Sequence, residues 1–215
     1  VSRLSFYILY TIEVMIIIGH RGAKGLAEEN SLRALKKALS VGVDKIEVDV
    51  RLHNTQLVLS HEPTLQSGEY CSLSDALRTV SGKVPFILEI KELSAVSQLA
   101  ALLERYDGEY TISSKSYDIL RSVREKLPNA PVAVIEKWSG VRAVAEASLL
   151  DTHEIHINHN WLWSGFVRSM KHRGYILYAY TVNSVERAQE LASWGVDGIF
   201  TDKPHKFIKG KGKNT

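Results

Sequence analysis

Residues 16–22 read Ile-Ile-Ile-Gly-His-Arg-Gly, or IIIGHRG in one-letter code. Three consecutive β-branched residues favour a buried β-strand. The strand ends in His20 and Arg21, a base and a permanent cation held between two glycines. Taken alone, the stretch also fits a strand followed by a turn with two solvated side chains. Functional groups in parallel α/β folds gather at the carboxyl ends of strands, so the rest of the chain decides between the two interpretations.

Short β-branched runs alternate with helical patterns along the whole chain. The strand candidates are 15–19, 45–50, 85–90, 109–113, 131–135, 154–157, 175–180 and 197–201. The helix candidates lie near 31–41, 73–81, 94–106, 116–127, 138–148, 160–172 and 183–194, with a stub after 203. Eight strand–helix units in about 190 residues favour an α/β fold of the small TIM (β/α)8 barrel type, with a doubly wound parallel sheet as the alternative.

Local signals predict where the first and last long helices begin and end. Asn30 and Asn183 are expected to cap their amino ends, and Gly42 and Gly195 to follow their last turns. An extra short strand at 56–60 follows the second main strand through a turn. No glycine-rich nucleotide loop follows any strand, which weakens the case for a nucleotide-binding fold.

The composition predicts one soluble globular domain. The chain has 215 residues, of which 45% are hydrophobic and 24% charged, an ordinary balance for such proteins. The formal net charge of +3 is small and no basic stripe is interleaved with aromatic residues, so no nucleic-acid partner is expected. Cys71 is the single cysteine, which excludes an intramolecular disulfide and favours a reducing, cytoplasmic location.

The amino-terminal region carries an apolar run at 4–18 that resembles a weak signal sequence or membrane anchor. Glu13 interrupts the run, no small-residue cleavage site follows, and the run is shorter than the roughly 20 residues of a membrane span. We therefore expect an extension at 1–14, a barrel domain at 15–208 and a flexible tail at 209–215. Peripheral membrane contact through the apolar run stays an alternative that is not favoured.

Carboxylates stand inside two otherwise apolar strands. Glu47 and Asp49 are two residues apart, so they project from the same face of their strand. Two carboxylates on one buried face repel each other unless a cation lies between them, either a divalent metal or an Arg or Lys from a neighbouring strand. Glu89 would add a third carboxylate at the same rim, with Lys91 beside it. Three oxygen donors suit one hard ion, Mg²⁺, Ca²⁺ or Mn²⁺.

Histidines and cations end the neighbouring strands. His20 ends the first strand and His61 ends the extra strand, so both can reach the same rim. Two imidazoles form an acid/base pair near neutral pH. Arg21 and Lys91 supply the donors that a phosphoryl group needs. The set predicts a site for an anionic ester, most simply a phosphodiester. Three more histidines surround the sixth strand and are candidates for the pocket border: His153, His156 and His159.

These motifs carry a family resemblance. The chain resembles the glycerophosphodiester phosphodiesterase family from Met15 to Lys206. The matching segments are GHRG (19–22), EENSLRAL (28–35), GVDKIEVDV (42–50), LVLSHE (57–62), LEIK (88–91), YTVN (180–183) and GVDGIFTDKP (195–204).

The resemblance implies a TIM barrel that hydrolyses glycerophosphodiesters to sn-glycerol 3-phosphate and an alcohol. It also implies three sets of site residues: Glu47, Asp49 and Glu89 holding one divalent metal, His20 and His61 as general acid and base, and Arg21 and Lys91 at the phosphate. The implied partner is a small-molecule substrate.

The chain departs from the family pattern around the second histidine. Glu62 follows His61 where the family usually has aspartate, which alters the geometry of a carboxylate that orients the imidazole or assists the metal. The family's Pro-Glu-Asn motif reads Glu-Glu-Asn at 28–30. Position 89 comes only 28 residues after position 61, and many relatives carry a larger insertion in this segment. The resemblance therefore predicts an open mouth and weak selectivity for the headgroup.

Aromatic residues near the last strands leave substrate questions open. Tyr180 stands where the family often has tryptophan. Trp161 and Trp163 follow the sixth strand, where they either face a choline-like cation or pack together at a helix start. Phospholipase D-like cleavage of lysophospholipids on the same barrel is the alternative activity. A non-catalytic barrel kept as a binding module would lack one of the three carboxylates or two histidines, and all five are present.

Overall fold

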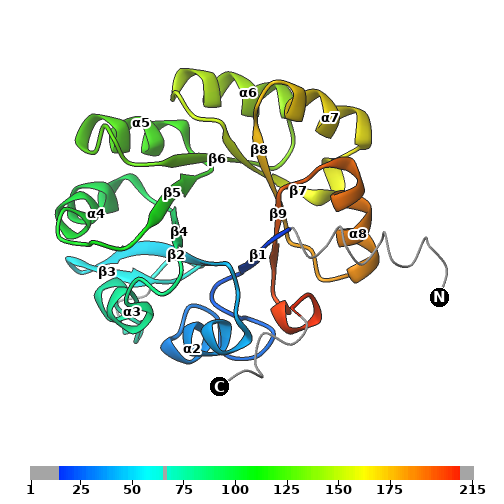
Figure 1. Cartoon of the computed structure of the whole chain (residues 1–215). Coiled ribbons are helices and arrows are strands. Elements are labelled where there is room, and N and C mark those ends of the chain that lie inside the picture. The colour runs from blue at the N-terminus through cyan, green and yellow to red at the C-terminus, as the bar shows by residue number, and fades with distance from the viewer. Residues whose placement is uncertain (1–14, 65–66, 209–215) are drawn as a thin grey trace.

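The computed structural model describes residues 15–64 and 67–208, which form a closed barrel of parallel strands ringed by helices (Figure 1). The barrel strands are β1 (Ile16–Gly19), β2 (Lys45–His53), β4 (Phe86–Ile90), β5 (Tyr110–Ser114), β6 (Val132–Glu136), β7 (Glu154–Asn158), β8 (Ile176–Tyr180) and β9 (Gly198–Thr201). β1 pairs in parallel with both β2 and β9, and this pairing closes the ring. The barrel prediction is confirmed, and the doubly wound sheet is excluded.

Helices follow the strands in the predicted order and cover the outside of the barrel (Figure 1). They are α2 (Leu32–Val41), α3 (Leu73–Val80), α4 (Val96–Leu103), α5 (Tyr117–Lys126), α6 (Gly140–Leu149), α7 (Ser164–His172) and α8 (Val185–Trp194). Short 3-10 helices lie at Leu93–Ala95, His159–Trp161 and Pro204–Lys206. The helices predicted at 94–106 and 160–172 are shorter than expected, because each region begins with one of these 3-10 turns.

The predicted amino-terminal caps are wrong by one residue. Ser31 caps α2 and Ser184 caps α8, and each hydroxyl accepts a hydrogen bond from a backbone N–H three residues later. Asn30 and Asn183 precede them and donate their side-chain amides to carboxylates of β2 and of the segment after β9. These asparagines therefore connect the helix starts to the barrel mouth.

The predicted carboxyl-terminal glycines are confirmed. Gly42 has a φ of 86° and Gly195 a φ of 100°, the left-handed conformation that a side chain disfavours. Their N–H groups donate to carbonyls of the last helical turn.

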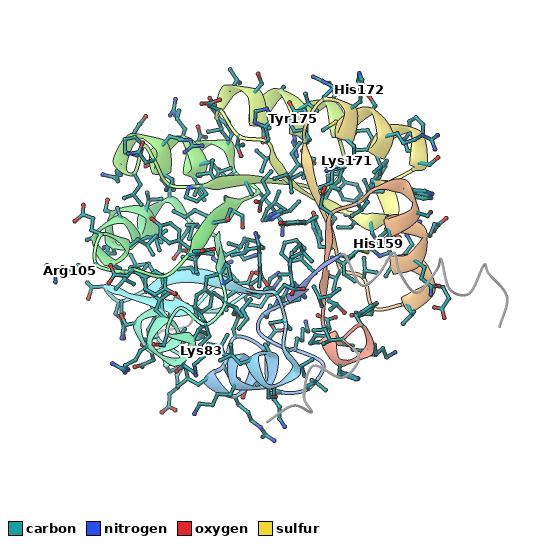
Figure 2. The ribbon with its side chains drawn as sticks, in the orientation of Figure 1. Lys83, Arg105, His159, Lys171, His172 and Tyr175 are labelled. Carbon is teal, nitrogen blue, oxygen red and sulfur yellow. The ribbon has the colours of Figure 1, made fainter. Side chains whose placement is uncertain are left out.

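Strand alternation divides apolar residues between two cores. Outward-facing residues of the strands, such as Ile46 and Val48, pack beneath the helices in the larger core. Inside the barrel, a smaller cluster of Ile18, Tyr178 and Phe200 fills the space below the mouth. Figure 2 shows side chains occupying both the barrel interior and the layer between strands and helices. The inside of the barrel is therefore filled by apolar side chains, and the polar residues at the carboxyl ends of the strands lie above this packed layer.

A hairpin extends the barrel at one side of the mouth. β3 (Gln56–Leu59) pairs antiparallel with the end of β2, with Val50 opposite Leu59. This ladder prolongs β2 to His53, beyond its predicted end at 50. The hairpin delivers the chain to His61, next to the barrel strands.

The apolar run at 4–18 contributes its last residues to the barrel. Met15 is buried and Ile16–Gly19 form β1, so these residues are not an exposed anchor. The rest of the run, with the predicted extension at 1–14, and the tail at 209–215 lie outside the described residues. Among the residues that the structure does describe, none of the helices combines the length and apolar character needed to cross a membrane.

Candidate active site

A cavity of about 270 Å³ opens at the carboxyl ends of the strands. Its lining includes His20, Arg21, Glu47, His61, Glu89 and Tyr180 from the predicted site. Glu62 and Trp161 are not part of this lining, and Asp49 and Lys91 lie behind it, bonded to residues that are. The cavity thus brings residues from several separate strand ends to one place.

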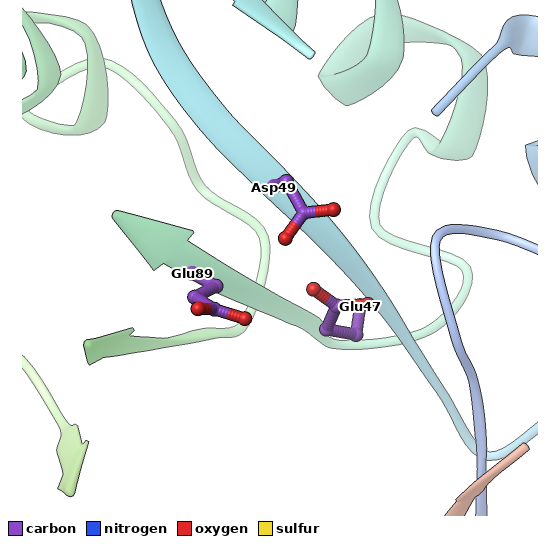
Figure 3. Close-up of side chains that lie close together, drawn as sticks. All are labelled: Glu47, Asp49 and Glu89. Atoms are coloured by element: carbon purple, nitrogen blue, oxygen red, sulfur yellow. The ribbon is translucent and has the colours of Figure 1, made fainter. Parts of the chain in front are cut away.

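The three predicted carboxylates lie together. Asp49 on β2 is the register partner of Glu89 on β4, and Glu47 stands two residues before Asp49 on the same face. One oxygen from each lies within 4.8 Å of the others, and Figure 3 shows the three groups turned toward a common space. Oε1 of Glu47 is buried and has no hydrogen-bond partner in the described ranges. An all-oxygen cluster with an unpaired buried oxygen fits a hard divalent cation such as Mg²⁺, Ca²⁺ or Mn²⁺.

Protein cations already neutralise part of this cluster. Nζ of Lys91 lies 2.6 Å from Oδ1 of Asp49 and 2.5 Å from Oε1 of Glu89. Nε of Arg21 lies 3.1 Å from Oδ2 of Asp49. Burial alone would raise the pKa of Asp49, but Lys91, Arg21 and a hydrogen bond from Asn30 hold that pKa below its ordinary value. Asp49 is therefore neutralised by Arg and Lys side chains, which the sequence also allows as the alternative to a metal ion.

Glu47 lacks an equivalent cation. Its complete burial, with repulsion from Asp49, raises the pKa of Glu47 from 4.5 to about 7. Oε2 accepts a hydrogen bond from the backbone N–H of Arg21 at 2.8 Å. Because burial disfavours the ionised form of Glu47, a bound cation would lower the pKa of this carboxylate.

His20 is oriented by a carboxylate from the opposite end of the chain. Its Nδ1–H donates to Oδ1 of Asp202 at 2.7 Å, and Nε2 lies 3.9 Å from Oε2 of Glu47. Asp202 is itself held by the side-chain amide of Asn183 at 2.8 Å. Burial lowers the pKa of His20, but the hydrogen bond to Asp202 and the charge of Glu47 outweigh it, so the pKa is raised. The sequence motif TDKP contained Asp202, but its partner could not be read from the sequence.

The glycines of GHRG are required by close packing. A Cβ on Gly19 would lie 2.2 Å from the carbonyl oxygen of Gly22. Gly22 has a φ of 82°, and a Cβ there would lie 2.8 Å from the Ala34 backbone. Arg21 also takes a positive φ of 51°. The tight turn between the glycines is what places His20 and Arg21 side by side at the cavity.

His61 enters the cavity from the hairpin side. Its Nδ1–H donates to Oε1 of Glu62 at 2.7 Å, and the Glu62 side chain is 80% exposed. The longer glutamate therefore still reaches the imidazole. One third of the His61 side chain is exposed, against 16% for His20. His61 therefore lies at the solvent-exposed side of the cavity and His20 at its more buried side.

The cavity has a cation that the sequence reasoning missed. Lys115 directly follows β5 and lines the cavity, half exposed, with Nζ 3.4 Å from Oε1 of Glu89. Arg21 also lines the cavity, anchored by Oε1 of Glu29 at 2.8 Å. Lys91 is buried under the carboxylates instead. The position of Lys115 after a predicted strand was the signal that could have found it.

Of the three histidines around β7, His156 lines the cavity. His153 packs against Tyr175 before the strand begins, and the backbone carbonyl of His159 accepts a hydrogen bond from the side chain of Arg187. The expectation for a pocket border therefore holds for His156, while the other two make contacts elsewhere.

The tryptophans after β7 lie on the rim. Trp161 is half exposed and packs edge-on against Trp138, with ring centroids 5.7 Å apart. Trp163 is 63% exposed. Tyr180 is inside, where its hydroxyl donates to the carbonyl of Glu136 at 3.1 Å. Of the two alternatives for Trp161 and Trp163, a choline-like cation or mutual packing, neither is decided by these contacts, and the ring partner of Trp161 is Trp138.

Comparison with known proteins identifies the family of the chain. The profile of the Glycerophosphoryl diester phosphodiesterase family matches residues 20–69 and 80–206. YhdW of Bacillus subtilis is 27% identical over 93% of this chain and 100% of its own length. The glycerophosphodiester phosphodiesterase of Caldanaerobacter subterraneus subsp. tengcongensis is 25% identical, over 90% of this chain and 96% of its own.

Solved structures share the fold. A phosphodiesterase of Oleispira antarctica, in complex with its product sn-glycerol-3-phosphate, superposes with a TM-score of 0.84. The alignment has 22% sequence identity and covers 93% of this chain and 97% of that one. The match to the family profile spans most of the barrel and includes both His20 and Asp202. The chain therefore belongs to the glycerophosphoryl diester phosphodiesterase family and is a phosphoric diester hydrolase.

Proposed function

We propose that this protein hydrolyses glycerophosphodiesters to sn-glycerol 3-phosphate and an alcohol, and that it requires one divalent metal ion. The observation that carries the proposal is the cluster of Glu47, Asp49 and Glu89 in the same cavity as two histidines. The names of the relatives and the product in the Oleispira structure support this substrate class.

The cluster would hold the metal ion, which supplies charge neutralisation at a phosphoryl oxygen when bound. Arg21 and Lys115 line the same cavity and would donate to the remaining phosphoryl oxygens. Lys91 would act from behind, since its ammonium group contacts both Asp49 and Glu89 and holds these side chains in place. These side chains together would bind a dianionic transition state more strongly than a monoanionic substrate.

The two histidines would transfer the protons. Asp202 takes the Nδ1–H of His20, so Nε2 is the nitrogen that exchanges a proton with the substrate or with water. Glu62 fixes His61 in the same manner. One histidine would activate the nucleophile, either water or the glycerol 2-hydroxyl, and the other would protonate the leaving alkoxide.

A second activity, cleavage of lysophospholipids, is favoured by one observation. Trp138 follows the carboxyl end of β6, Trp161 and Trp163 follow that of β7, and each exposes about half or more of its surface. Exposed indole rings beside an active site would accommodate an acyl chain. A higher rate on a long-chain lysophospholipid than on glycerophosphocholine would assign the protein to this activity instead.

The test is release of sn-glycerol 3-phosphate from glycerophosphocholine by purified protein. We expect no release with EDTA and recovery when Mg²⁺, Ca²⁺ or Mn²⁺ is restored. Asp49→Asn should abolish the recovery, whereas Asp118→Asn, a matched change at an exposed position of α5, should leave it intact. Full activity in EDTA would contradict the metal requirement, and no release with any ion from folded protein would contradict the substrate.

A further inference from the structure

The floor of the cavity holds two polar groups that the proposed chemistry does not use. Ser113 on β5 and His156 on β7 both line the cavity and are fully buried. Within the described ranges, Oγ of Ser113 and Nδ1 of His156 have no hydrogen-bond partner. Buried polar groups are normally paired, and leaving them unpaired costs stability. Two unpaired groups in the lining of one cavity point to a ligand that pairs them.

The imidazole of His156 is held in one orientation. Nε2 lies 2.8 Å from Oε1 of Glu154, so Nε2–H donates to that carboxylate. The ring packs edge-on against Phe200 at 4.8 Å between centroids and stacks on Tyr178 at 5.6 Å. With Nε2–H committed to Glu154, Nδ1 of the neutral ring is a hydrogen-bond acceptor. The contacts of the ring therefore fix the direction in which Nδ1 faces the cavity.

Ser113 complements this acceptor. It is the register partner of Glu89, so its hydroxyl lies one strand away from the carboxylate cluster. A serine hydroxyl both donates and accepts, and an alcohol requires both kinds of partner. Two apolar residues of the lining neighbour His156: Phe200 packs against its ring, and Ile135 is its register partner on β6. The floor suits an uncharged hydroxyl better than a second anionic group.

We propose that Ser113 and His156 form a hydroxyl-binding subsite, which pairs an alcohol group of the glycerol moiety while the phosphate is bound by the groups named above. The subsite rests on the proposed function and specifies which part of the substrate enters the barrel. His156 and Ser113 are in this view specificity-determining residues, and they distinguish glycerol esters from phosphate esters without hydroxyls.

Neighbouring serines provide a matched test. Ser113→Ala removes a hydroxyl that has no partner among the described residues of the free protein, so the melting temperature should stay the same or rise. Ser114→Ala removes a hydroxyl that donates to the carbonyl of Ile90 at 2.8 Å, so the melting temperature should fall. Ser114 is not in the cavity lining, and this substitution should leave ligand preference unchanged.

Ligand preference is measured by calorimetric binding of two compounds, sn-glycerol 3-phosphate and n-propyl phosphate, which has the same carbon chain without hydroxyls. We expect the wild-type protein to prefer the glycerol ester, and Ser113→Ala to reduce that preference about 5- to 10-fold. The double variant His156→Phe with Glu154→Gln, which leaves no unpaired buried charge, should reduce it at least as much. Ser114→Ala should keep the wild-type ratio.

The subsite is refuted if neither the Ser113 nor the His156 variant changes the ratio of the two dissociation constants, or if Ser114→Ala changes it equally. A wild-type protein that binds neither compound, or both equally, also overturns it. Because the readout is binding, the outcome is separate from that of the proposed function: selective binding without release of glycerol 3-phosphate would overturn the hydrolytic activity and leave the subsite standing.

Discussion

Replacing Glu47 by glutamine should stabilise the metal-free protein at neutral pH. The pKa of Glu47 is raised from 4.5 to about 7, because the carboxylate is fully buried and Asp49 repels it. The native state then binds more protons than the unfolded state between pH 4.5 and 7, so stability falls as pH rises through this window. At about 1.4 kcal/mol per pKa unit, ionising Glu47 costs about 3 kcal/mol at pH 7.5.

A glutamine side chain at this position would carry no charge at any pH and would still accept the hydrogen bond from the backbone of Arg21. The raised pKa of His20 also makes the stability of the wild type fall as pH rises, because the stabilising charge of the imidazolium is then lost. A domain of this size changes its melting temperature by roughly 2–4 °C per kcal/mol. The difference in melting temperature between Glu47→Gln and the wild type should therefore grow by about 6–12 °C from pH 4.5 to pH 7.5.

The assay is thermal unfolding in EDTA at four pH values across this range. Glu62→Gln, a matched change at an exposed carboxylate beside the site, should follow the wild type. Adding an ion at 100 times its dissociation constant should stabilise the wild type by about 2.7 kcal/mol at pH 7.5, and Glu47→Gln by much less. A difference in melting temperature between wild type and Glu47→Gln that stays constant with pH would refute the raised pKa of this carboxylate.

Three further predictions concern the groups around the cluster. His20→Ala and His61→Ala should each lower kcat by about 10²- to 10⁴-fold with the circular dichroism spectrum unchanged, and mild losses in both would remove them as the acid/base pair. The pKa of Asp202 is held at about 2, since hydrogen bonds from His20 and Asn183 outweigh its burial. Its stabilising charge is therefore present above about pH 4 and lost toward pH 2, so Asp202→Asn should lower the free energy of unfolding at pH 6 by about 2 kcal/mol, with the deficit vanishing at pH 2. A deficit that persists at pH 2 in denaturant titrations would contradict this. Lys115→Met should raise KM for glycerophosphocholine about 10-fold through loss of a phosphate contact, and an unchanged KM in steady-state assays would place this lysine outside the substrate site.

The sequence was most informative where local patterns determine geometry. Alternation within β2 predicted that Glu47 and Asp49 share a face, and the parallel order of strands brought Glu89 to them. Strand-end position alone predicted that His20 and His61 reach one cavity. These residues were predicted because a strand's direction and a barrel's closure together determine where its carboxyl end lies.

Long-range pairing explains what the sequence did not reveal. Asn30 is a residue type that often caps helices, but its side-chain amide donates to Asp49. The adjacent Ser31 caps the helix instead. A propensity cannot tell which of two adjacent capping residues has a better tertiary partner. Ser113 was not predicted, and His156 was predicted only as a candidate for the pocket border, because the unpaired polar atoms of both residues can be recognised only in the folded chain.

The pairing of β1 with β9 makes the orientation of His20 depend on closure of the barrel. Ile16–Gly19 pair with Gly198–Thr201, and His20 meets Asp202 across 182 positions of sequence. Contacts this distant in sequence require closure of a loop that includes nearly all of the domain. In a chain with every earlier strand–helix unit folded but β9 not yet paired, the barrel would be open on one side. The imidazole of His20 would then lack its hydrogen bond to Asp202. Under the role proposed for His20, turnover requires the completed ring, and we expect turnover to recover during refolding only once β9 has paired with β1.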